Sequence, residues 1–201
     1  VAPCKVGPDY IDTGFHELVC GRPSHNLDSF LIEPQDLPLL LSRPADITVI
    51  EGVMGYYDGM DATSCRQSTW EMAQLTQTPA LLVVDASGSA ASVAATVKGF
   101  MTLKAESGIA GVLVNRVSGA HHYELVRDAV AHYTGLPCVG YIEKNVNLAL
   151  KSRHLGLVPA EEVADALPRI REAARQVADT LDWPMILDLA KRAPSLPAMP
   201  K

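Results

Sequence analysis

Short apolar stretches alternate with longer mixed segments along this chain. The apolar stretches are nearly continuous in Val, Ile and Leu, as expected for strands covered on both faces, and they span residues 46–53, 80–86, 109–117 and 137–142. The segments between them suit helices and span residues 67–77, 89–107 and 119–134. Strand followed by helix, repeated, favours parallel strands joined by right-handed crossovers. The pattern predicts an α/β fold with a parallel sheet flanked by helices.

The two ends of the chain differ from this middle. Residues 1–6 read as the last part of a strand, but the stretch 4–16 holds two glycines and a proline, which is poor material for a helix or strand interior. Residues 161–181 predict an amphipathic helix that is interrupted or restarted at Pro168. A short helix is expected after Trp183.

Composition and charge exclude several classes of protein. The formal net charge is −6 and the basic residues are scattered, so we expect no nucleic-acid partner. The four cysteines show no CxxC spacing, which disfavours zinc and disulfides and is typical of a cytoplasmic protein. No apolar run approaches the ~20 residues that span a bilayer, and no signal-peptide pattern opens the chain. We expect a cytoplasmic protein with no membrane segment.

Polar residues stand where the predicted strands end, which is where ligands bind in parallel α/β sheets. The sharpest stretch is VIEGVMGYYDGMD, in which Glu51 ends a strand and Asp58 follows seven residues later in a loop that three glycines are expected to make flexible. Two such carboxylates are oxygen ligands of the kind that Mg²⁺ prefers. The alternative is that Glu51 caps the next helix and Asp58 starts an Asp-Gly turn.

The next strand exits carry weaker signals. Asp85 either takes part in phosphate and metal chemistry or caps a helix. The amide of Asn115 can pair with the edge of an adenine, or Asn115 is a turn residue followed by a solvated Arg116. We expect His121 and His122, at a predicted helix start, to face solvent.

Beyond the last strand, the compact run SRHLGL brings Arg153 and His154 together, a pair that suits an anionic substrate. Three familiar motifs do not occur in the sequence: a GxxxxGK[ST] phosphate loop, a GxSxG nucleophile elbow and a GxGxxG dinucleotide fingerprint. The missing phosphate loop contrasts with strand exits that otherwise suit phosphates and metal.

Five ordered motifs resemble those of one family. KVGPDYID with the following FH, EGVMGYYDG, STWEMAQ leading into PALLVVDASGSAAS, GVLVNRV and SRHLGLVPAEE are similar to cobyrinic acid a,c-diamide synthase, a glutamine-dependent amidotransferase of corrinoid biosynthesis. The resemblance runs over residues 3–165. It implies a P-loop NTPase fold like that of dethiobiotin synthetase, followed by a glutaminase domain in the same chain.

The resemblance also implies a domain organisation. Residues 1–190 would be the ATP-dependent synthetase domain, incomplete at its amino terminus because the family's phosphate loop precedes KVGPDYID. The proline-rich residues 191–201 would be the linker toward the glutaminase domain. We expect no ATP turnover by these 201 residues alone. A homodimer is compatible with this interpretation.

The implied reaction is the ATP- and glutamine-dependent amidation of the a and c acetate groups of cobyrinic or hydrogenobyrinic acid through an acyl phosphate. By resemblance, Glu51 and Asp58 would serve Mg²⁺ and phosphoryl transfer, with Lys5 neutralising oxygens. The corrinoid side would be lined by Asp9, Tyr10, Ile11, Asp12, His16, Arg153 and His154, and the ATP side by Asp85, Asn115 and Arg116. Alternatives are a nickel-sirohydrochlorin a,c-diamide synthase, a dethiobiotin-synthetase-like ligase, and a ParA/MinD-like regulatory ATPase.

Overall fold

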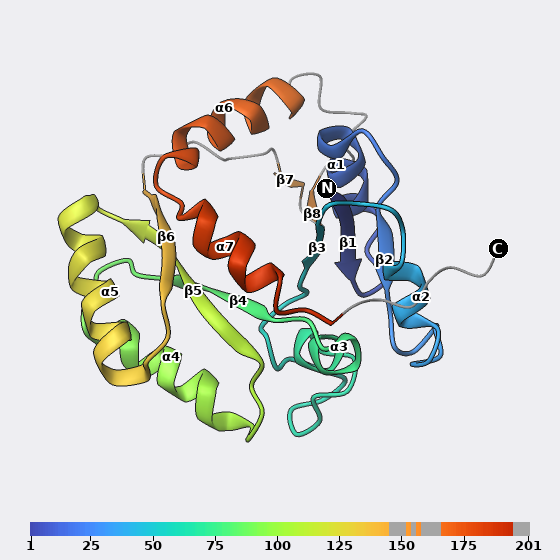
Figure 1. The fold of residues 1–201 in the computed structure, drawn as a ribbon, viewed down its shortest axis with the longest axis horizontal. Helices are drawn as coiled ribbons and strands as arrows, with labels where there is room; N and C mark the ends of the chain where they lie inside the picture. Colours follow the sequence, from blue (N-terminus) through green and yellow to red (C-terminus); the bar gives the residue numbers. More distant parts are fainter. Residues whose placement is uncertain (145–151, 154–155, 158–165, 195–201) are drawn as a thin grey trace. The chain divides into compact units, whose positions relative to one another are not determined.

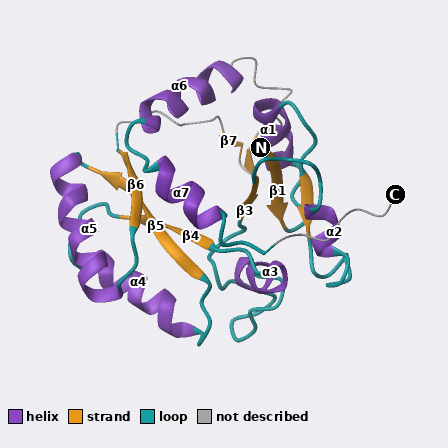
Figure 2. Cartoon of the chain, in the orientation of Figure 1, coloured by secondary structure: helices purple, strands orange, loops and turns teal. Residues whose placement is uncertain are grey.

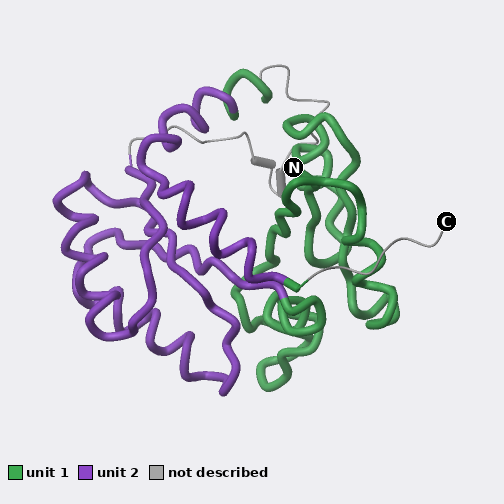
Figure 3. The backbone as a smooth tube through the Cα atoms, viewed as in Figure 1, with its two compact units in different colours: residues 1–77, 149–170, 194–201 green, residues 78–148, 171–193 purple. Residues whose placement is uncertain are grey.

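The computed structural model describes residues 1–144, 152–153, 156–157 and 166–194. The chain divides into two compact units (Figure 3), which are unit 1 (Val1–Gln77, Ala149–Ile170 and Pro194–Lys201) and unit 2 (Thr78–Leu148 and Arg171–Ala193). Each unit has its own three-stranded parallel sheet with helices around it (Figures 1 and 2). The predicted α/β class with parallel strands is confirmed, but the strands divide between two sheets. A continuous apolar run indicates that a strand is buried, but it does not indicate which strand lies beside it in the sheet.

Unit 1 has a sheet with the strand order β2-β1-β3, in which both neighbouring pairs are parallel. Its strands are β1 (Ala2–Val6), β2 (His25–Leu27) and β3 (Thr48–Glu51). Its helices are α1 (Ile11–Cys20), α2 (Leu37–Leu41) and α3 (Thr69–Thr76). The strand at the amino terminus, β3 and α3 confirm predictions, whereas β2 and α2 were not predicted.

Alternation along β1 assigns its two faces to different neighbours. Every residue of β1 is buried. Cys4 and Val6 lie on one face, in a hydrophobic cluster with residues of α2 and α3 such as Leu37 and Met72. Because successive side chains of a strand point to opposite faces, Lys5 projects from the other face, where it meets α1. One strand thus carries both the core of unit 1 and a buried cation.

Helix α1 corrects the expectation that the stretch after β1 is unsuited to regular structure. The Asp9 side chain accepts hydrogen bonds from the backbone N–H groups of Ile11 (2.7 Å) and Asp12 (3.4 Å), so donors that a helix start leaves without partners are satisfied. Gly14 costs a helix about 1 kcal/mol, and burial of Phe15 offsets that cost. Tertiary packing overrides local propensity here.

Unit 2 has the strand order β4-β5-β6, again with parallel pairs. Its strands are β4 (Ala80–Asp85), β5 (Ile109–Val117) and β6 (Cys138–Glu143). Its helices include α4 (Ser92–Leu103), α5 (Ala120–Thr134) and α7 (Trp183–Ala190). All six elements confirm predictions to within a few residues at each end.

Helices cover both faces of the unit 2 sheet. Figure 1 shows α4 and α5 along one face and α7 along the other. Val112 and Val114 of β5 are completely buried. A Cβ atom at Gly111 would lie 3.1 Å from a methyl group of Leu189 on α7, so the small residue lets α7 pack closely on the sheet. The nearly continuous apolar pattern of β5 has this two-sided burial as its cause.

Three smaller elements complete the described chain. Helix α6 spans Ala166–Ala178 with Pro168 in its first turn, where proline is tolerated, and so is not interrupted there; the earlier part of the predicted 161–181 helix lies outside the described residues. Strands β7 (Ser152–Arg153) and β8 (Gly156–Leu157) form an antiparallel pair. None of the described helices has the length and apolar character needed to cross a membrane. All four cysteines are free thiols, as expected.

Candidate functional site

One register position of the unit 1 sheet carries a row of polar residues. Lys5 of β1 pairs with Asn26 of β2 on one side and with Glu51 of β3 on the other. Paired residues of neighbouring strands project from the same face, so these three side chains lie in line near the carboxyl ends of their strands. Asn26 was not predicted, because a three-residue strand is too short to show a periodic pattern.

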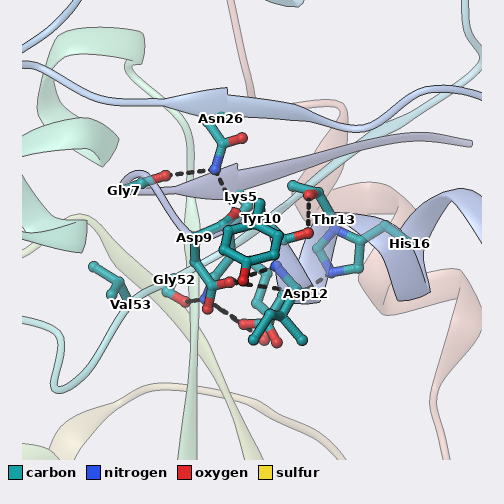
Figure 4. A network of polar contacts seen from close by, with 12 residues as sticks. Lys5, Gly7, Asp9, Tyr10, Asp12, Thr13, His16, Asn26, Gly52 and Val53 are labelled. Carbon is teal, nitrogen blue, oxygen red and sulfur yellow. Dashed lines mark hydrogen bonds and ion pairs between the residues drawn. The ribbon is translucent and has the colours of Figure 1, made fainter. Parts of the chain in front are cut away.

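Lys5 is a buried cation that is neutralised by carboxylates of unit 1. Its side chain is 5% exposed. Its Nζ donates a hydrogen bond to the Gly52 carbonyl oxygen at 2.7 Å and lies 3.1 Å from Asp12 Oδ2 (Figure 4). The same atom lies 3.8 Å from Glu51 Oε1. The Gly52 carbonyl and Asp12 lie within hydrogen-bond distance of the ammonium, and Glu51 adds a longer ion pair. The arrangement suits a lysine that neutralises carboxylates.

Glu51 is held from a second side by His16. The His16 Nε2 atom lies 2.6 Å from Glu51 Oε2, and His16 Nδ1 lies 3.1 Å from the Ser24 hydroxyl oxygen. The Glu51 side chain is 49% exposed, in contrast to the buried Lys5. We call Lys5, Asp12, His16 and Glu51 the Lys5 cluster. It joins a strand, a helix and a strand exit, and one of its carboxylates faces solvent.

The alternative role of Glu51 as a helix cap does not fit the structure. Helix α3 has Ser68 as its N-cap, and the Ser68 hydroxyl accepts a hydrogen bond from the backbone N–H of Glu71. The Glu71 carboxylate in turn accepts hydrogen bonds from the Gln67 N–H at 2.7 Å and from the Ser29 hydroxyl at 2.6 Å. Because α3 is capped in this way, Glu51 is left to the Lys5 cluster.

The turn after β1 presents an exposed tyrosine next to the Lys5 cluster. The Asn26 amide donates hydrogen bonds to the carbonyl oxygens of Gly7 (2.6 Å) and Asp9 (2.7 Å), as Figure 4 shows. Gly7 has a φ of +82°, which glycine adopts without strain. Tyr10 is 76% exposed, while Ile11 begins α1. Of the predicted corrinoid-side residues, Asp9 and Tyr10 therefore form a fixed turn with an accessible aromatic ring, and Ile11 and Asp12 open α1.

The loop after β3 holds Asp58 in a tight turn. Its Oδ2 atom accepts a hydrogen bond from the Gly55 N–H at 2.8 Å, and its own N–H donates to the Gly55 carbonyl oxygen at 3.0 Å. Asp58 therefore closes a turn that begins at Gly55, whereas the alternative prediction had Asp58 starting an Asp-Gly turn. The glycines were expected to make the loop flexible, but the structure gives them packing roles. A Cβ atom at Gly52 would lie 2.8 Å from the Thr69 hydroxyl oxygen.

Aromatic side chains anchor the same loop. Tyr56 and Tyr57 are buried and their rings meet edge to face with centroids 4.9 Å apart, and the Tyr57 ring lies 6.2 Å from that of Trp70. Burial raises the pKa of both Tyr56 and Tyr57, so neither phenol ionises near neutral pH. The two tyrosines act here as packing residues that position the turn of Asp58.

The predicted ATP-side residues lie in unit 2. Asp85 pairs with Asn115 in the sheet register, and hydrogen bonds from the side chain and backbone of Ser87 lower the pKa of Asp85. Arg116 has a φ of +60° at a register shift of β5, and its Nη1 lies 3.6 Å from Asp85 Oδ2. Asp85 closes a turn and does not cap α4, whose N-cap is Ala91.

His122 corrects a prediction, because it does not simply face solvent. Its Nε2 lies 2.6 Å from the Ser89 carbonyl oxygen, and its Nδ1 accepts a hydrogen bond from the Ser118 N–H at 3.1 Å. His121 is exposed, as expected. An open cavity of about 610 Å³ lies at these loops and is lined by residues 88–90 and 118–122 together with Leu125 and Lys144. Asp85, Asn115 and Arg116 are not among its lining residues.

Comparison with curated proteins identifies relatives of the whole chain. It is 42% identical over 204 residues to a "Cobyrinate a,c-diamide synthase" of Listeria monocytogenes, covering 100% of this chain and 45% of the relative. A protein of the same name from Thermoplasma acidophilum is 44% identical over 201 residues, covering 98% and 44%. One from Salmonella typhimurium is 43% identical over 193 residues, covering 94% and 42%.

The chain is a relative of the cobyrinate a,c-diamide synthases. The resemblance predicted from the five motifs is thus confirmed. The chain spans less than half the length of these cobyrinate a,c-diamide synthases. No protein-family model and no solved structure matches it.

Two residues that the cobyrinate a,c-diamide synthase motifs single out lie where the structure gives no side-chain information. His154 is outside the described residues, and of Arg153 only the backbone, in β7, is described. Their predicted place on the corrinoid side stays a prediction.

The donor set of unit 1 fits a magnesium ion that shares its coordination with other ligands. Among the residues that the structure describes, no group of three or more His, Cys, Asp or Glu side chains forms a metal site. Mg²⁺ is usually held by one or two carboxylates together with water and phosphate oxygens. Glu51 and Asp58 supply oxygens of that kind. In the Lys5 cluster, two carboxylates outnumber one ammonium when His16 is neutral, so a cation would be favoured beside Glu51.

Proposed function

We propose that the complete protein amidates the a and c acetate groups of cobyrinic or hydrogenobyrinic acid, with ATP and glutamine as co-substrates, in cobalamin biosynthesis. The observation that carries this proposal is the Lys5 cluster, in which Lys5 pairs with the half-exposed Glu51 and with Asp12, two residues after the exposed Tyr10. The names of its relatives support the same reaction. The accessible aromatic ring suits a largely apolar macrocycle, and a cation bound beside Glu51 would offset the repulsion between the carboxylates of the site and the acetate groups.

The chemistry answers a simple difficulty, which is that ammonia does not displace an oxide from a carboxylate. A carboxylate oxygen of the acetate attacks the γ-phosphorus of ATP and ADP leaves, so that an acyl phosphate forms. Ammonia released from glutamine then attacks the acyl carbon, and inorganic phosphate leaves with that oxygen. Mg²⁺ would supply charge stabilisation for the transferring phosphoryl group.

The residues of this chain would divide the work between two sides. On the acceptor side, Glu51 and Asp58 would provide metal ligands, while residues 9–12 and His16 would line the corrinoid pocket with Arg153 and His154. Lys5 would hold Glu51 and Asp12 in place. On the nucleotide side, Asn115 would bind adenine, with Asp85 and Arg116 nearby in the same sheet. The phosphate loop and the glutaminase domain would come from outside these 201 residues.

The experiment compares Glu51→Gln with the unchanged complete protein. Glutamine keeps the shape of the side chain and removes its charge, so amidation of cobyrinic acid should fall by more than about 100-fold while glutamine hydrolysis continues. Mass spectrometry of the corrinoid and a glutamate assay measure the two activities. Oxygen-18 from a labelled acetate should appear in inorganic phosphate if the acyl phosphate forms.

The matched control is Glu33→Gln, which neutralises an exposed carboxylate of unit 1 outside the Lys5 cluster. It should amidate as well as the unchanged protein. Loss of glutamine hydrolysis alone in Glu51→Gln, with ammonia-dependent amidation intact, would contradict the assignment of Glu51 to the acyl-phosphate step.

A further inference from the structure

A chain of three side chains runs from the interior of unit 1 to the exposed carboxylate of Glu51. Ser24 is 9% exposed, and its hydroxyl lies 3.1 Å from His16 Nδ1. The other ring nitrogen, His16 Nε2, lies 2.6 Å from Glu51 Oε2. Ser24 is itself fixed, because its backbone N–H donates a hydrogen bond to Glu17 Oε1 at 3.1 Å.

This arrangement is not a hydrolytic triad, although it contains a serine, a histidine and a carboxylate. In such a triad, Nε2 of the histidine faces the serine nucleophile and Nδ1 faces the buried acid. Here Nδ1 faces Ser24 and Nε2 faces Glu51. The serine is buried and the carboxylate is the accessible end. Chemistry at this site would therefore occur at Glu51, with Ser24 behind it.

The hydrogen-bond inventory determines the tautomer of His16. An ionised carboxylate can only accept hydrogen bonds, so His16 Nε2 must carry the proton that Glu51 Oε2 accepts. In the neutral ring, Nδ1 is then an acceptor, and the Ser24 hydroxyl donates to it. Glu51 and Ser24 thus favour the same tautomer, Glu51 by accepting from Nε2–H and Ser24 by donating to Nδ1.

We propose that His16 and Ser24 are positioning residues for Glu51, in which Ser24 fixes the His16 ring through Nδ1 and His16 orients the Glu51 carboxylate through Nε2. The proposal rests on the proposed function of Glu51. Lys5 approaches Oε1 at 3.8 Å and His16 holds Oε2, so the carboxylate plane is set from two sides. Each oxygen has two lone pairs, which leaves acceptor capacity on the exposed side for a cation or the reacting group.

The orientation of ligating carboxylates by a second layer of hydrogen bonds typically matters by 10–100-fold in metal affinity or activity. Ser24→Ala removes the hydroxyl and should therefore lower kcat for amidation by about 10-fold or more, with the KM for glutamine and glutamine hydrolysis unchanged. Ser24→Thr keeps a hydroxyl and should recover most of the loss. Ser42→Ala is the matched control, since the Ser42 hydroxyl donates to the Pro38 carbonyl oxygen elsewhere in unit 1.

A double-mutant cycle tests whether Ser24 acts through His16. The side-chain amide of the His16→Gln variant keeps an N–H that can donate to Glu51. It has no imidazole Nδ1 that could accept a hydrogen bond from Ser24. Adding Ser24→Ala to His16→Gln should therefore cause no further loss of kcat. Independent losses that multiply would overturn the proposal, as would a Ser24→Ala protein with unchanged kcat.

A spectroscopic measurement on the complete protein separates this inference from the proposed function. Nitrogen-15 NMR of labelled histidines, with the His16 signals identified by their loss in His16→Gln, should show the Nε2–H tautomer. Ser24→Ala should shift the Nδ1 resonance of His16, because Nδ1 loses its hydrogen-bond donor, and Ser42→Ala should leave the spectrum unchanged. A His16 ring that carries its proton on Nδ1, or an Nδ1 resonance that does not respond to Ser24→Ala, would overturn the proposal even if the complete protein amidates cobyrinic acid. Absence of amidation with the expected spectrum would instead refute the proposed function alone.

Discussion

The charged residues at the strand exits include a buried lysine in unit 1 but are exposed in unit 2. In unit 1, Lys5 is buried against Asp12 and Glu51, and every partner comes from a different element. In unit 2, Asp85 and Arg116 are more than half exposed and pair at 3.6 Å. Both exits follow apolar strands of a parallel sheet, so the sequence pattern alone makes them look alike.

The difference lies in what covers each exit. Helix α1 lies against the Lys5 face of β1, so the charged groups there must satisfy one another, and their geometry is set before any ligand arrives. The Asp85–Arg116 pair remains in water, where its attraction is screened and small. Preorganised charge is what phosphoryl transfer requires, which makes unit 1 the better candidate for the chemical step and unit 2 for recognition.

We expect the largest difference in stability between the two units from Lys5→Met. The variant keeps the apolar stem but leaves Asp12 and Glu51 without their cation, so the free energy of unfolding of unit 1 should fall by about 3 kcal/mol. The chain has two tryptophans, Trp70 in unit 1 and Trp183 in unit 2. Urea unfolding of a Trp183→Phe background, followed by Trp70 fluorescence, measures the loss.

The control for Lys5→Met uses the other tryptophan. In a Trp70→Phe background, the transition reported by Trp183 should be affected less than the one reported by Trp70. A loss below about 1 kcal/mol in unit 1 would mean that the Lys5 cluster is worth no more than a surface ion pair, and the comparison would fail.

A smaller effect is expected from pH, again in unit 1. Burial, and then the charge of Arg43, lower the pKa of His25, and the Arg43 guanidinium donates to His25 Nε2. Because the folded state binds this proton less readily than the unfolded state, stability is complete above the ordinary pKa of about 6.5 and falls as pH drops below it. Urea unfolding at pH 7.5 and 5.5, followed by Trp70, should show the loss, and His25→Asn should reduce the difference between the two values.

The smallest effect is expected in unit 2. Arg116→Gln removes the charge that faces Asp85, and the free energy of unfolding reported by Trp183 should change by less than about 0.5 kcal/mol, because the pair is exposed. If Arg116 binds nucleotide, the same variant should weaken ATP binding by the complete protein. A loss of stability above 1 kcal/mol would show that the unit 2 exit is organised like that of unit 1.

Much of the fold could be predicted because its elements are long and apolar. Strand β5 and helix α5 coincide closely with the predicted 109–117 and 119–134. Helix α1, β2 and α2 were missed for physical reasons. Helix α1 begins after a glycine-proline turn and depends on Asp9 and on burial, while β2 and α2 have three and five residues, too few for a period to emerge.

Most residues of the candidate site were predicted, but the contacts between them were not. Lys5, Asp12, His16 and Glu51 were all singled out, and the structure brings these four together. Ser24 and Asn26 were not, because a single serine or asparagine outside a motif carries no signal. Asp58 was paired with Glu51 in the prediction, whereas its contacts in the structure are to Gly55 in its own turn.

The sequence by itself determined where the buried strands end, which polar residues follow them and which family the chain is related to, because these depend on neighbouring residues and their order. Only the tertiary structure decided that Asn26, Lys5 and Glu51 share one row and that His16 lies between Ser24 and Glu51. Those relations depend on strand register and on the packing of α1, which join residues far apart in the sequence. Burial makes the charged residues at the unit 1 strand exits a fixed cluster, whereas the charged residues at the unit 2 strand exits remain a solvated pair.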